Sequence, residues 1–393
     1  MRNVIGYFRN KTRVLCYVCF FIIGGVQAQP GTIPQFPEWM IEKRIHVLNY
    51  QTPILLNYNP SVQAYIDVYT VKRRKHLANI ISRSKLYFPL FEEYLDKYNL
   101  PLELKYLAVI ESALDPRAKS TSGAMGLWQF LYHAGSMFNL NVSTYMDQRC
   151  DPVLATEAAC QYLEYLYRIF NDWQLALAAY NGGPGVVEKA IKRSGGIRDY
   201  WQLRPYLPDQ VKGYVPAFIA ANYVMHYHAN YDIEVQAPKY SYRDLDTVMV
   251  QQSLTFQHIS DVVGISMDDL TFLNPVFIKQ TIPVGDKPVR LLLPIKYITA
   301  FVQNEALLYQ MPERKKTPKE SAFSEKTVHI VAKGEYFHKI AIQHGCTIND
   351  ILKWNGITSR NLHPGQELII WKQKNPQKFF FIKDEIDNLA ERK

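Results

Sequence analysis

Glu111 is the residue of this sequence whose type and placement are best suited to catalysis. It lies in a segment expected to be helical, beginning at Pro101 and ending before Pro116. Apolar residues recur there at steps of three and four, and Glu111 shares their face with Leu104, Leu107, Ala108 and Leu114. Burial of a carboxylate raises its pKa, and a carboxylic acid that stays protonated near neutral pH can act as a general acid. The alternative is a glutamate that accepts amide hydrogen bonds or pairs with an arginine such as Arg117.

Two glycine-containing segments could form walls of a cleft beside this acid. The first, 121–130, is a turn that runs into an apolar stretch and carries the amide of Gln129. The second, 175–185, is a helix that ends in a glycine cluster with Tyr180 and Asn181 at the break. Glycine allows positive φ angles and the close approach of a ligand, although the second segment also fits an ordinary helix end.

Other chemistries lack their local motifs. The sequence contains no H-E-x-x-H, G-x-S-x-G, P-loop or G-x-G-x-x-G pattern, so we expect no metal and no cofactor. Beyond residue 28 the cysteines are Cys150, Cys160 and Cys346, whose odd number and irregular spacing give no disulfide framework. A bridge between Cys150 and Cys160 and two buried free thiols are both compatible with the sequence.

The elements that must position these residues form one helical domain, expected over residues 60–235. Residues 29–59 contain several prolines and are predicted to be an extended lead-in. Residues 311–326 are charged and carry two prolines, which is typical of a linker, and 372–393 form a charged, solvated tail.

Composition places the chain among globular proteins. Its 393 residues are 48% hydrophobic and 21% charged, enough for two or three cores. The formal charge is +9, and the basic residues at positions 2, 9, 11 and 13 contribute four of these charges, leaving +5. So mild a bias does not favour nucleic acid as a partner.

The amino terminus predicts export. A basic stretch precedes the apolar run 14–26, and Ala28 completes a small-x-small cleavage site, so residues 1–28 are expected to be a signal peptide. The run is short for a membrane span, although an uncleaved anchor is the alternative. We therefore expect a protein of the periplasm or cell envelope. Peripheral association with a membrane and the oligomeric state are left open by the sequence.

An internal repeat with an offset of 81 residues divides the second half of the chain. The copies lie at 247–295 and 327–371, and each is expected to fold as strand, helix, helix, strand. The matching pairs are Phe256 and Phe337, Ile259 and Ile340, Gly264 and Gly345, Asp269 and Asp350, Leu270 and Ile351, and Asn274 and Asn355.

These copies resemble LysM modules, a family that binds glycans containing N-acetylglucosamine. The second copy is closer to the family pattern, and the resemblance implies that its glycan-binding positions are Gly334, Tyr336, Asn355, Gly356, Leu362 and Pro364. The first copy has Ser253 where the family has glycine, so we expect a degenerate module that binds glycan or serves as a spacer.

The helical domain resembles the soluble-lytic-transglycosylase domain of the lytic murein transglycosylase family. The motifs that carry the resemblance are Glu111-Ser112, Asp115-Pro116, Gly126-Leu-Trp-Gln129, Ala179-Tyr-Asn181 and Tyr214-Val215, in this order. The fold class implied is an α+β multidomain chain, with an all-α lysozyme-like catalytic domain followed by two small βααβ LysM modules.

The resemblance also implies a reaction on peptidoglycan glycan strands. Glu111 would protonate the glycosidic oxygen between N-acetylmuramic acid and N-acetylglucosamine, and the C6 hydroxyl of the sugar would attack, leaving a 1,6-anhydro end. Gln129, Tyr180 and Asn181 would line the groove, Ser112 would support the chain turn and Tyr214 would orient the carboxyl. The alternatives are a hydrolytic muramidase, which needs a second carboxylate, and a non-catalytic peptidoglycan-binding scaffold.

Overall fold

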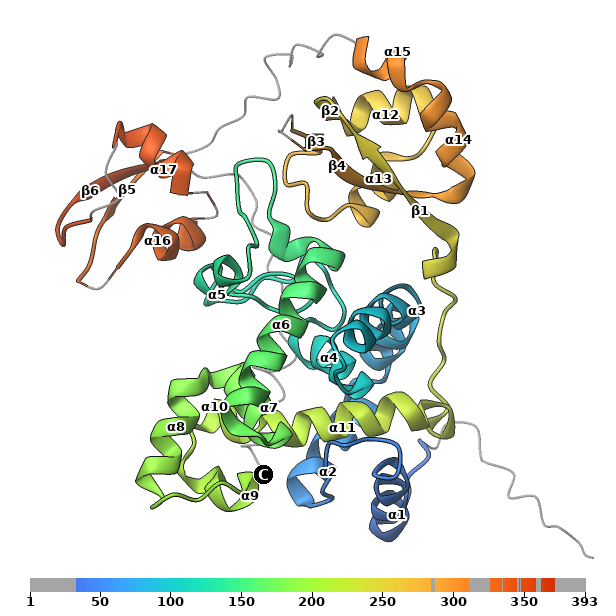
Figure 1. Ribbon diagram of the computed structural model, residues 1–393, viewed down its shortest axis with the longest axis vertical. Helices are drawn as coiled ribbons and strands as arrows, with labels where there is room; N and C mark the ends of the chain where they lie inside the picture. The colour runs from blue at the N-terminus through green and yellow to red at the C-terminus, as the bar shows by residue number, and fades with distance from the viewer. Residues whose placement is uncertain are drawn as a thin grey trace, which may run out of the picture.

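The structure is a computed structural model in which a helical domain is followed by two small modules that contain strands (Figure 1). It describes residues 33–283, 287–310, 326–333, 335–344, 346, 348–357 and 362–371. The predicted signal peptide, the tail and all but the last residue of the predicted linker lie outside these residues. Within them, every helix is too short or too polar to serve as a membrane span.

The lead-in is not wholly extended as predicted, because it contains helix α1 (Glu38–Leu48). Pro37 precedes the helix and Pro53 follows it, so neither proline interrupts its hydrogen bonds. Its buried side chains, Ile41, Ile45 and Leu48, lie at steps of four and three residues and form one apolar face. The prediction relied on the number of prolines in the whole segment and overlooked that these eleven residues contain none.

The helical domain is built around α11 (Tyr214–Tyr227), which packs against α1, α2, α4 and α7. Every residue from Tyr214 to Val224 is buried, so this helix is surrounded by protein rather than facing solvent on one side. The other helices are α2 (Pro60–Asp67), α3 (Arg74–Lys97), α4 (Leu107–Ser112), α5 (Tyr132–Met137), α6 (Pro152–Phe170), α7 (Trp173–Gly182), α8 (Pro184–Arg193), α9 (Tyr200–Leu203) and α10 (Asp209–Lys212). Single turns connect them: a π turn at Val68–Lys72 and 3₁₀ turns at Leu102–Tyr106, Gln148–Cys150, Arg204–Tyr206 and His228–Tyr231.

Local signals fix the ends of α6 and α7. The Asp151 side chain caps α6 by accepting hydrogen bonds from two backbone amides, and Pro152 occupies the first turn. The helix ends at Asn171, whose φ is 49°, and Asp172 then caps α7. The tight connection places α6 and α7 side by side, which brings their aromatic residues together.

The cysteines of the helical domain are buried free thiols. The alternative of a bridge between Cys150 and Cys160 is therefore not realised. Burial raises the pKa of Cys160 to about 12 and that of Cys150 further, so both stay protonated and unreactive.

The first module extends beyond its predicted end at residue 295. Strand β1 (Leu245–Val250) pairs antiparallel with β4 (Val289–Pro294), and the short strands β2 (Leu254–Thr255) and β3 (Thr281–Ile282) pair with each other. Helices α12 (Phe256–Val263) and α13 (Met267–Leu273) lie between the strands, as the repeat predicts, and a 3₁₀ turn at Tyr242–Asp244 precedes β1. Helices α14 (Ile295–Gln303) and α15 (Glu305–Gln310) follow, and their residues Phe301 and Leu308 belong to the same core.

The second module has the predicted strand, helix, helix, strand order. Strand β5 (Lys326–Ile330) pairs antiparallel with β6 (Glu367–Trp371), and α16 (Phe337–His344) and α17 (Ile348–Asn355) lie between them. The repeat extends to side-chain bonding. Asn355 donates to the carbonyls of Ile351 and Ile369 and accepts from the Ile369 amide, and Asn274 makes the equivalent three bonds in the first module.

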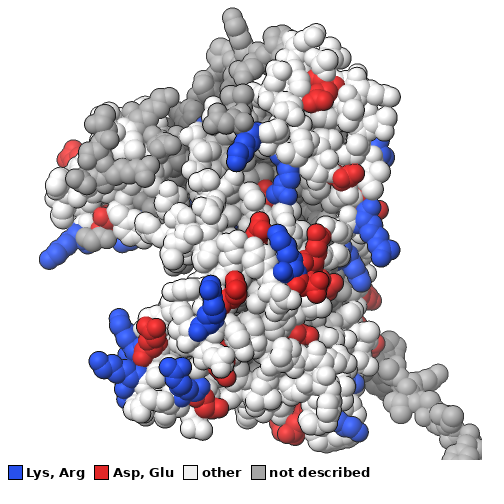
Figure 2. Space-filling view, viewed as in Figure 1, with Lys and Arg blue, Asp and Glu red and all other residues white. Residues whose placement is uncertain are grey.

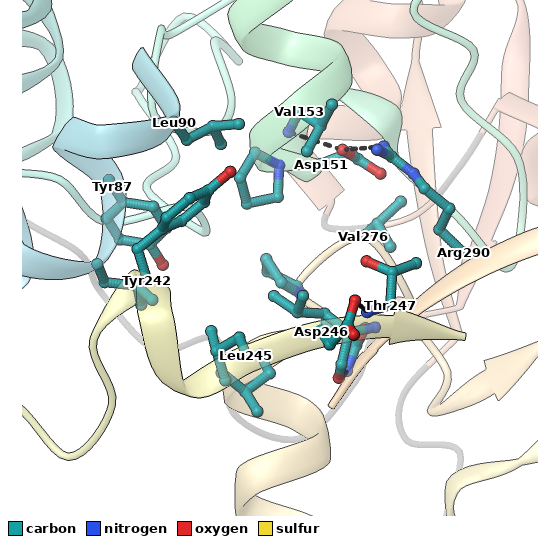
Figure 3. Close-up of a pocket in the computed structure, with 16 residues that line it drawn as sticks. Tyr87, Leu90, Asp151, Val153, Tyr242, Leu245, Asp246, Thr247, Val276 and Arg290 are labelled. Carbon is teal, nitrogen blue, oxygen red and sulfur yellow. Dashed lines mark hydrogen bonds and ion pairs between the residues drawn. The ribbon is translucent and has the colours of Figure 1, made fainter. Parts of the chain in front are cut away.

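The first module is docked against the helical domain along an interface that we call the seam. The Asp147 amide donates to the carbonyl of Val276 at 2.9 Å, and the Ile278 amide donates to the carbonyl of Tyr145 at 2.8 Å. Figure 3 shows Arg290 reaching from β4 to Asp151 at the start of α6, beside a pocket of about 260 Å³ lined by both bodies. Backbone bonds across the seam join the module to the domain like neighbouring strands of a sheet.

Candidate active site

Glu111 lies in the last turn of α4, at the point where the chain reverses. The helix ends at Ser112, earlier than the predicted boundary before Pro116, and it begins with a 3₁₀ turn at Leu102–Tyr106. Ala113 and Leu114 have φ angles of 53° and 59°, in the left-handed region that is strained for these residue types. Helical periodicity does not predict such a turn, because the pattern of apolar residues continues beyond it.

The Ser112 side chain stabilises this turn through hydrogen bonds to the backbone. Its hydroxyl is buried and lies within hydrogen-bond distance of two carbonyls, that of Ala108 at 3.0 Å and that of Leu127 at 2.8 Å. It therefore ties the end of α4 to the segment that carries Gln129. Ser112 is not among the residues that line the cleft.

Glu111 lines a cleft with a volume of about 370 Å³. Figure 2 shows the surface indented on the side of the molecule where α5 lies above α8, with basic and acidic side chains interspersed over this face. The cleft is lined by Glu111, Ser120, Thr121, Ser122, Ala124, Trp128, Gln129, Phe130, Leu131, Ala134, Tyr162, Tyr180, Asn181, Gly182, Gly183 and Gln210.

The Glu111 carboxylate accepts a short hydrogen bond from Tyr214 at the start of α11. The distance from the Tyr214 hydroxyl to Oε1 is 2.6 Å, and the tyrosine is fully buried. Burial, and then the charge of Glu111, raise the pKa of Tyr214 well above its ordinary value of 10.0. Tyr214 therefore stays protonated and keeps donating, which fixes the direction of the carboxyl group.

The other acids near Glu111 in sequence are engaged elsewhere. Asp115 lies 3.8 Å from Arg83, and Glu103 accepts a hydrogen bond from Thr52 at 3.0 Å. Arg117, considered above as a partner for Glu111, donates instead to the carbonyl of Thr271 across the seam. Among the described residues that line the cleft, Glu111 is the single carboxylic acid.

Gln129 and Tyr180 line the cleft, and the side chains of both also bond to backbone carbonyls. The Gln129 amide nitrogen donates to the carbonyls of Ala118 and Gly126, which leaves Oε1 free to accept from a sugar hydroxyl. The Tyr180 hydroxyl donates to the carbonyl of Trp128 at 2.8 Å. Asn181 follows at the end of α7, next to the glycines of the cleft.

Tyr162 and Gln210 line the cleft but were not singled out in the sequence. The Tyr162 ring on α6 lies 5.4 Å from that of Tyr180, between centroids, and 6.4 Å from that of Tyr165. Sugar rings pack against such aromatic surfaces through their apolar faces. The tyrosines three residues apart on α6 were a usable signal, whereas Gln210 lies in the short polar helix α10 with no motif around it.

The predicted glycan-binding positions of the second module differ in how far they are exposed to solvent. Tyr336 is exposed, and its ring lies 6.0 Å from that of His133 on α5, between centroids. Pro364 and Gly356 are also exposed, whereas Leu362 packs on the core of the module. The Asn355 amide is used to join α17 to β6, so its role is structural. Gly334 lies outside the described residues.

Comparison with known families follows this division of the chain. Residues 89–201 match the Transglycosylase SLT domain, 244–310 match the LysM-like domain of lytic transglycosylase MltD, and 329–371 match the LysM domain. The first LysM-type match ends with α15, in agreement with the enlarged module described above.

The curated proteins similar in sequence to this chain include two kinds of lytic murein transglycosylase. Membrane-bound lytic murein transglycosylase D of Escherichia coli K12 is 28% identical over 320 residues, which are 80% of this chain and 70% of that protein. Soluble lytic murein transglycosylase of the same strain is 32% identical over 141 residues, 34% of this chain and 22% of that protein. The solved 70 kDa soluble lytic transglycosylase Slt70 of E. coli aligns with a TM-score of 0.32 and 28% identity, covering 37% of this chain and 25% of its own.

Proposed function

We propose that this chain, a lytic transglycosylase that joins an SLT domain to two LysM-type modules, cleaves the β-1,4 bond between N-acetylmuramic acid and N-acetylglucosamine in peptidoglycan. The observation that carries the proposal is the Glu111 carboxyl, which faces the cleft and is oriented by Tyr214. In this proposal Gln129, Tyr180 and Asn181 bind the glycan strand on either side of it.

The proposed reaction uses Glu111 twice. The protonated carboxyl gives its proton to the glycosidic oxygen, and the bond from that oxygen to C1 of N-acetylmuramic acid breaks. The carboxylate then takes the proton of the C6 hydroxyl of the same sugar, and O6 bonds to C1. The products are a 1,6-anhydro end and a free hydroxyl on N-acetylglucosamine, and no water is consumed.

A single carboxyl supports this reaction over hydrolysis. A hydrolytic muramidase uses a second carboxylate to activate water or to form a covalent intermediate, at about 5–9.5 Å from the first. Asp115 and Glu103 are the sequence neighbours that could serve, but neither lines the cleft. Asp115 forms an ion pair with Arg83, and Glu103 accepts a hydrogen bond from Thr52.

The remaining parts of the proposal concern location and binding. A protein that acts on peptidoglycan works in the cell envelope, and the predicted signal peptide at 1–28 would deliver it to the periplasm. The second module would hold glycan through exposed positions such as Tyr336, while the Asn355 amide stabilises the module itself.

Product analysis tests the proposed function directly. The chain from residue 29 onward is incubated with purified sacculi, and the soluble sugars are separated and identified by mass. We expect muropeptides that end in 1,6-anhydro-N-acetylmuramic acid, each lighter by one water than its hydrolytic counterpart. A digest that contains only reducing ends would reject the transglycosylase in favour of the muramidase, and no release of sugars would favour the scaffold.

The hydrogen bond from Tyr214 should matter for turnover and little for binding. Tyr214→Phe removes a donor to a charged group, worth about 1.5–3 kcal/mol, so kcat should fall about 10-fold to 100-fold. Tyr200→Phe is a matched control, because that buried hydroxyl donates to the carbonyl of Lys212 and not to Glu111. Steady-state kinetics on a soluble glycan measures both variants. Equal losses in the two would assign Tyr214 a packing role only.

A further inference from the structure

Arg149 is a buried charged side chain that the proposed reaction does not use. It is 4% exposed and forms a two-pronged ion pair with Asp147, in which Nη2 lies 2.7 Å from Oδ2 and Nε lies 2.9 Å from Oδ1. A buried charge persists only when it is paired and its donors are satisfied. Arg149 lies in the 3₁₀ turn immediately before α6, and Asp147 caps that turn.

The remaining donors of Arg149 bind the segment that forms one wall of the cleft. Nη1 donates to the carbonyls of Gly123 and Phe130, at 3.0 and 3.3 Å. These two residues enclose the loop that carries Gln129, and Phe130 itself lines the cleft. One guanidinium therefore fixes both ends of the loop.

The backbone and stem of Arg149 reinforce this wall. A Cβ placed on Gly126 would lie 1.9 Å from the carbonyl oxygen of Arg149, so the loop rests directly on the arginine backbone. The side-chain carbons of Arg149 lie 3.4 Å from the ideal Cβ position of Gly135 on α5, the helix whose Ala134 lines the cleft.

The first module holds the other side of the same ion pair. The Asp147 amide donates to the carbonyl of Val276, and two residues earlier the Tyr145 carbonyl accepts from the amide of Ile278. The segment 145–147 is thus paired with an edge of the module on one side and bonded to Arg149 on the other. The contacts run without a break from the seam to the cleft wall.

We propose that Arg149 is a positioning residue for glycan binding, and that the first LysM-like module is a structural part of the cleft because it holds the segment 145–149 on which Arg149 depends. This rests on the proposed function for the identity of the glycan. Lysine cannot replace Arg149, since an ammonium group lacks the planar fork that binds Asp147 and two carbonyls at once.

Arg149→Lys tests the proposal, and Arg74→Lys is its matched control. Arg74 also bonds to carbonyls of distant segments, those of Tyr231 and Asp232, but lies in α3 away from the cleft. Binding of a soluble peptidoglycan glycan is measured by calorimetry with Glu111→Gln in the background, and KM and kcat are measured with Glu111 present. We expect Arg149→Lys to raise Kd and KM about 10-fold and to lower kcat by less than about threefold. Arg74→Lys should leave Kd and KM unchanged.

Ile278→Pro tests the contribution of the module, because proline removes the amide that donates to Tyr145. We expect a rise in Kd in the same direction as for Arg149→Lys and smaller. An unchanged Kd in Arg149→Lys, with kcat lowered only by loss of folded protein in thermal scans, would overturn the positioning role. A normal Kd in Ile278→Pro would overturn the role of the module. Failure of the parent chain to form anhydro sugars would reject the proposed function instead, and the Kd comparison would still decide the role of Arg149.

Discussion

Glu111→Gln should abolish measurable release of anhydro sugars, with a fall in rate of about 10²–10⁴ or more. Glutamine has nearly the shape of glutamic acid but can neither give a proton to the glycosidic oxygen nor take one from the C6 hydroxyl. Both halves of the proposed reaction depend on this one group, because the cleft lining contains no other carboxylic acid among the described residues. The amide still accepts the hydrogen bond from Tyr214, so the fold and glycan binding should persist.

The measurement combines product release from sacculi with binding of a soluble glycan. Glu103→Gln is the matched control, because this nearby acid bonds to Thr52 and lies outside the cleft lining. We expect the control to retain nearly all activity. If Glu111→Gln released anhydro sugars at a rate close to that of the parent, another residue would have to be the acid, and the proposed mechanism would be wrong.

Gly126→Ala should destabilise the helical domain by about 3 kcal/mol or more and remove most activity with it. Gly126 has a φ of 84°, and its added Cβ would lie 1.9 Å from the carbonyl oxygen of Arg149. The obstacle is backbone and not a flexible side chain, so either the loop or the 3₁₀ turn before α6 has to move. Such a shift would disturb the wall that carries Gln129.

Gly195→Ala separates this overlap from the cost of a positive φ alone. Gly195 has a φ of 79°, and nothing lies within 4 Å of the added carbon, so the variant should lose only about 1–2 kcal/mol. Thermal and denaturant unfolding of both variants give the comparison. Similar losses in the two variants would mean that the loop at Gly126 yields easily, contrary to the close contact described.

Much of the architecture could be predicted from sequence because it depends on local patterns. The repeat offset of 81 residues located both modules, and the structure reproduces even the paired roles of Asn274 and Asn355. Apolar spacing indicated a helical domain and placed Glu111 near its core. These signals come from residues close together in the chain, where periodicity and turn chemistry are informative.

The errors come from features that periodicity does not record. Helix α1 was hidden between two prolines, and the early end of α4 depends on Ala113 and Leu114, which have no left-handed preference of their own. The module was cut short at residue 295 because α14 and α15 lie outside the repeated unit. In each case tertiary packing decides where the element begins or ends.

The support of the cleft was invisible in the sequence for a different reason. Arg149 and Asp147 are two residues apart in a charged, irregular stretch, and nothing marks them as buried. Their importance comes from carbonyl groups of residues 123 and 130 and from a module more than a hundred residues later. Backbone acceptors have no residue-type signal, so such networks become apparent only in three dimensions.

The central position of α11 limits where the chain can be truncated without loss of the catalytic domain. The family match to the transglycosylase domain stops at residue 201, yet the helix that orients the acid begins at Tyr214 and has its first eleven residues enclosed by neighbours. A fragment that ended at residue 201 would lack α11. It would lose the buried helix at the centre of the domain and the Tyr214 hydroxyl that donates to Glu111. A catalytic fragment therefore has to extend at least through α11, and trimming experiments should keep that helix.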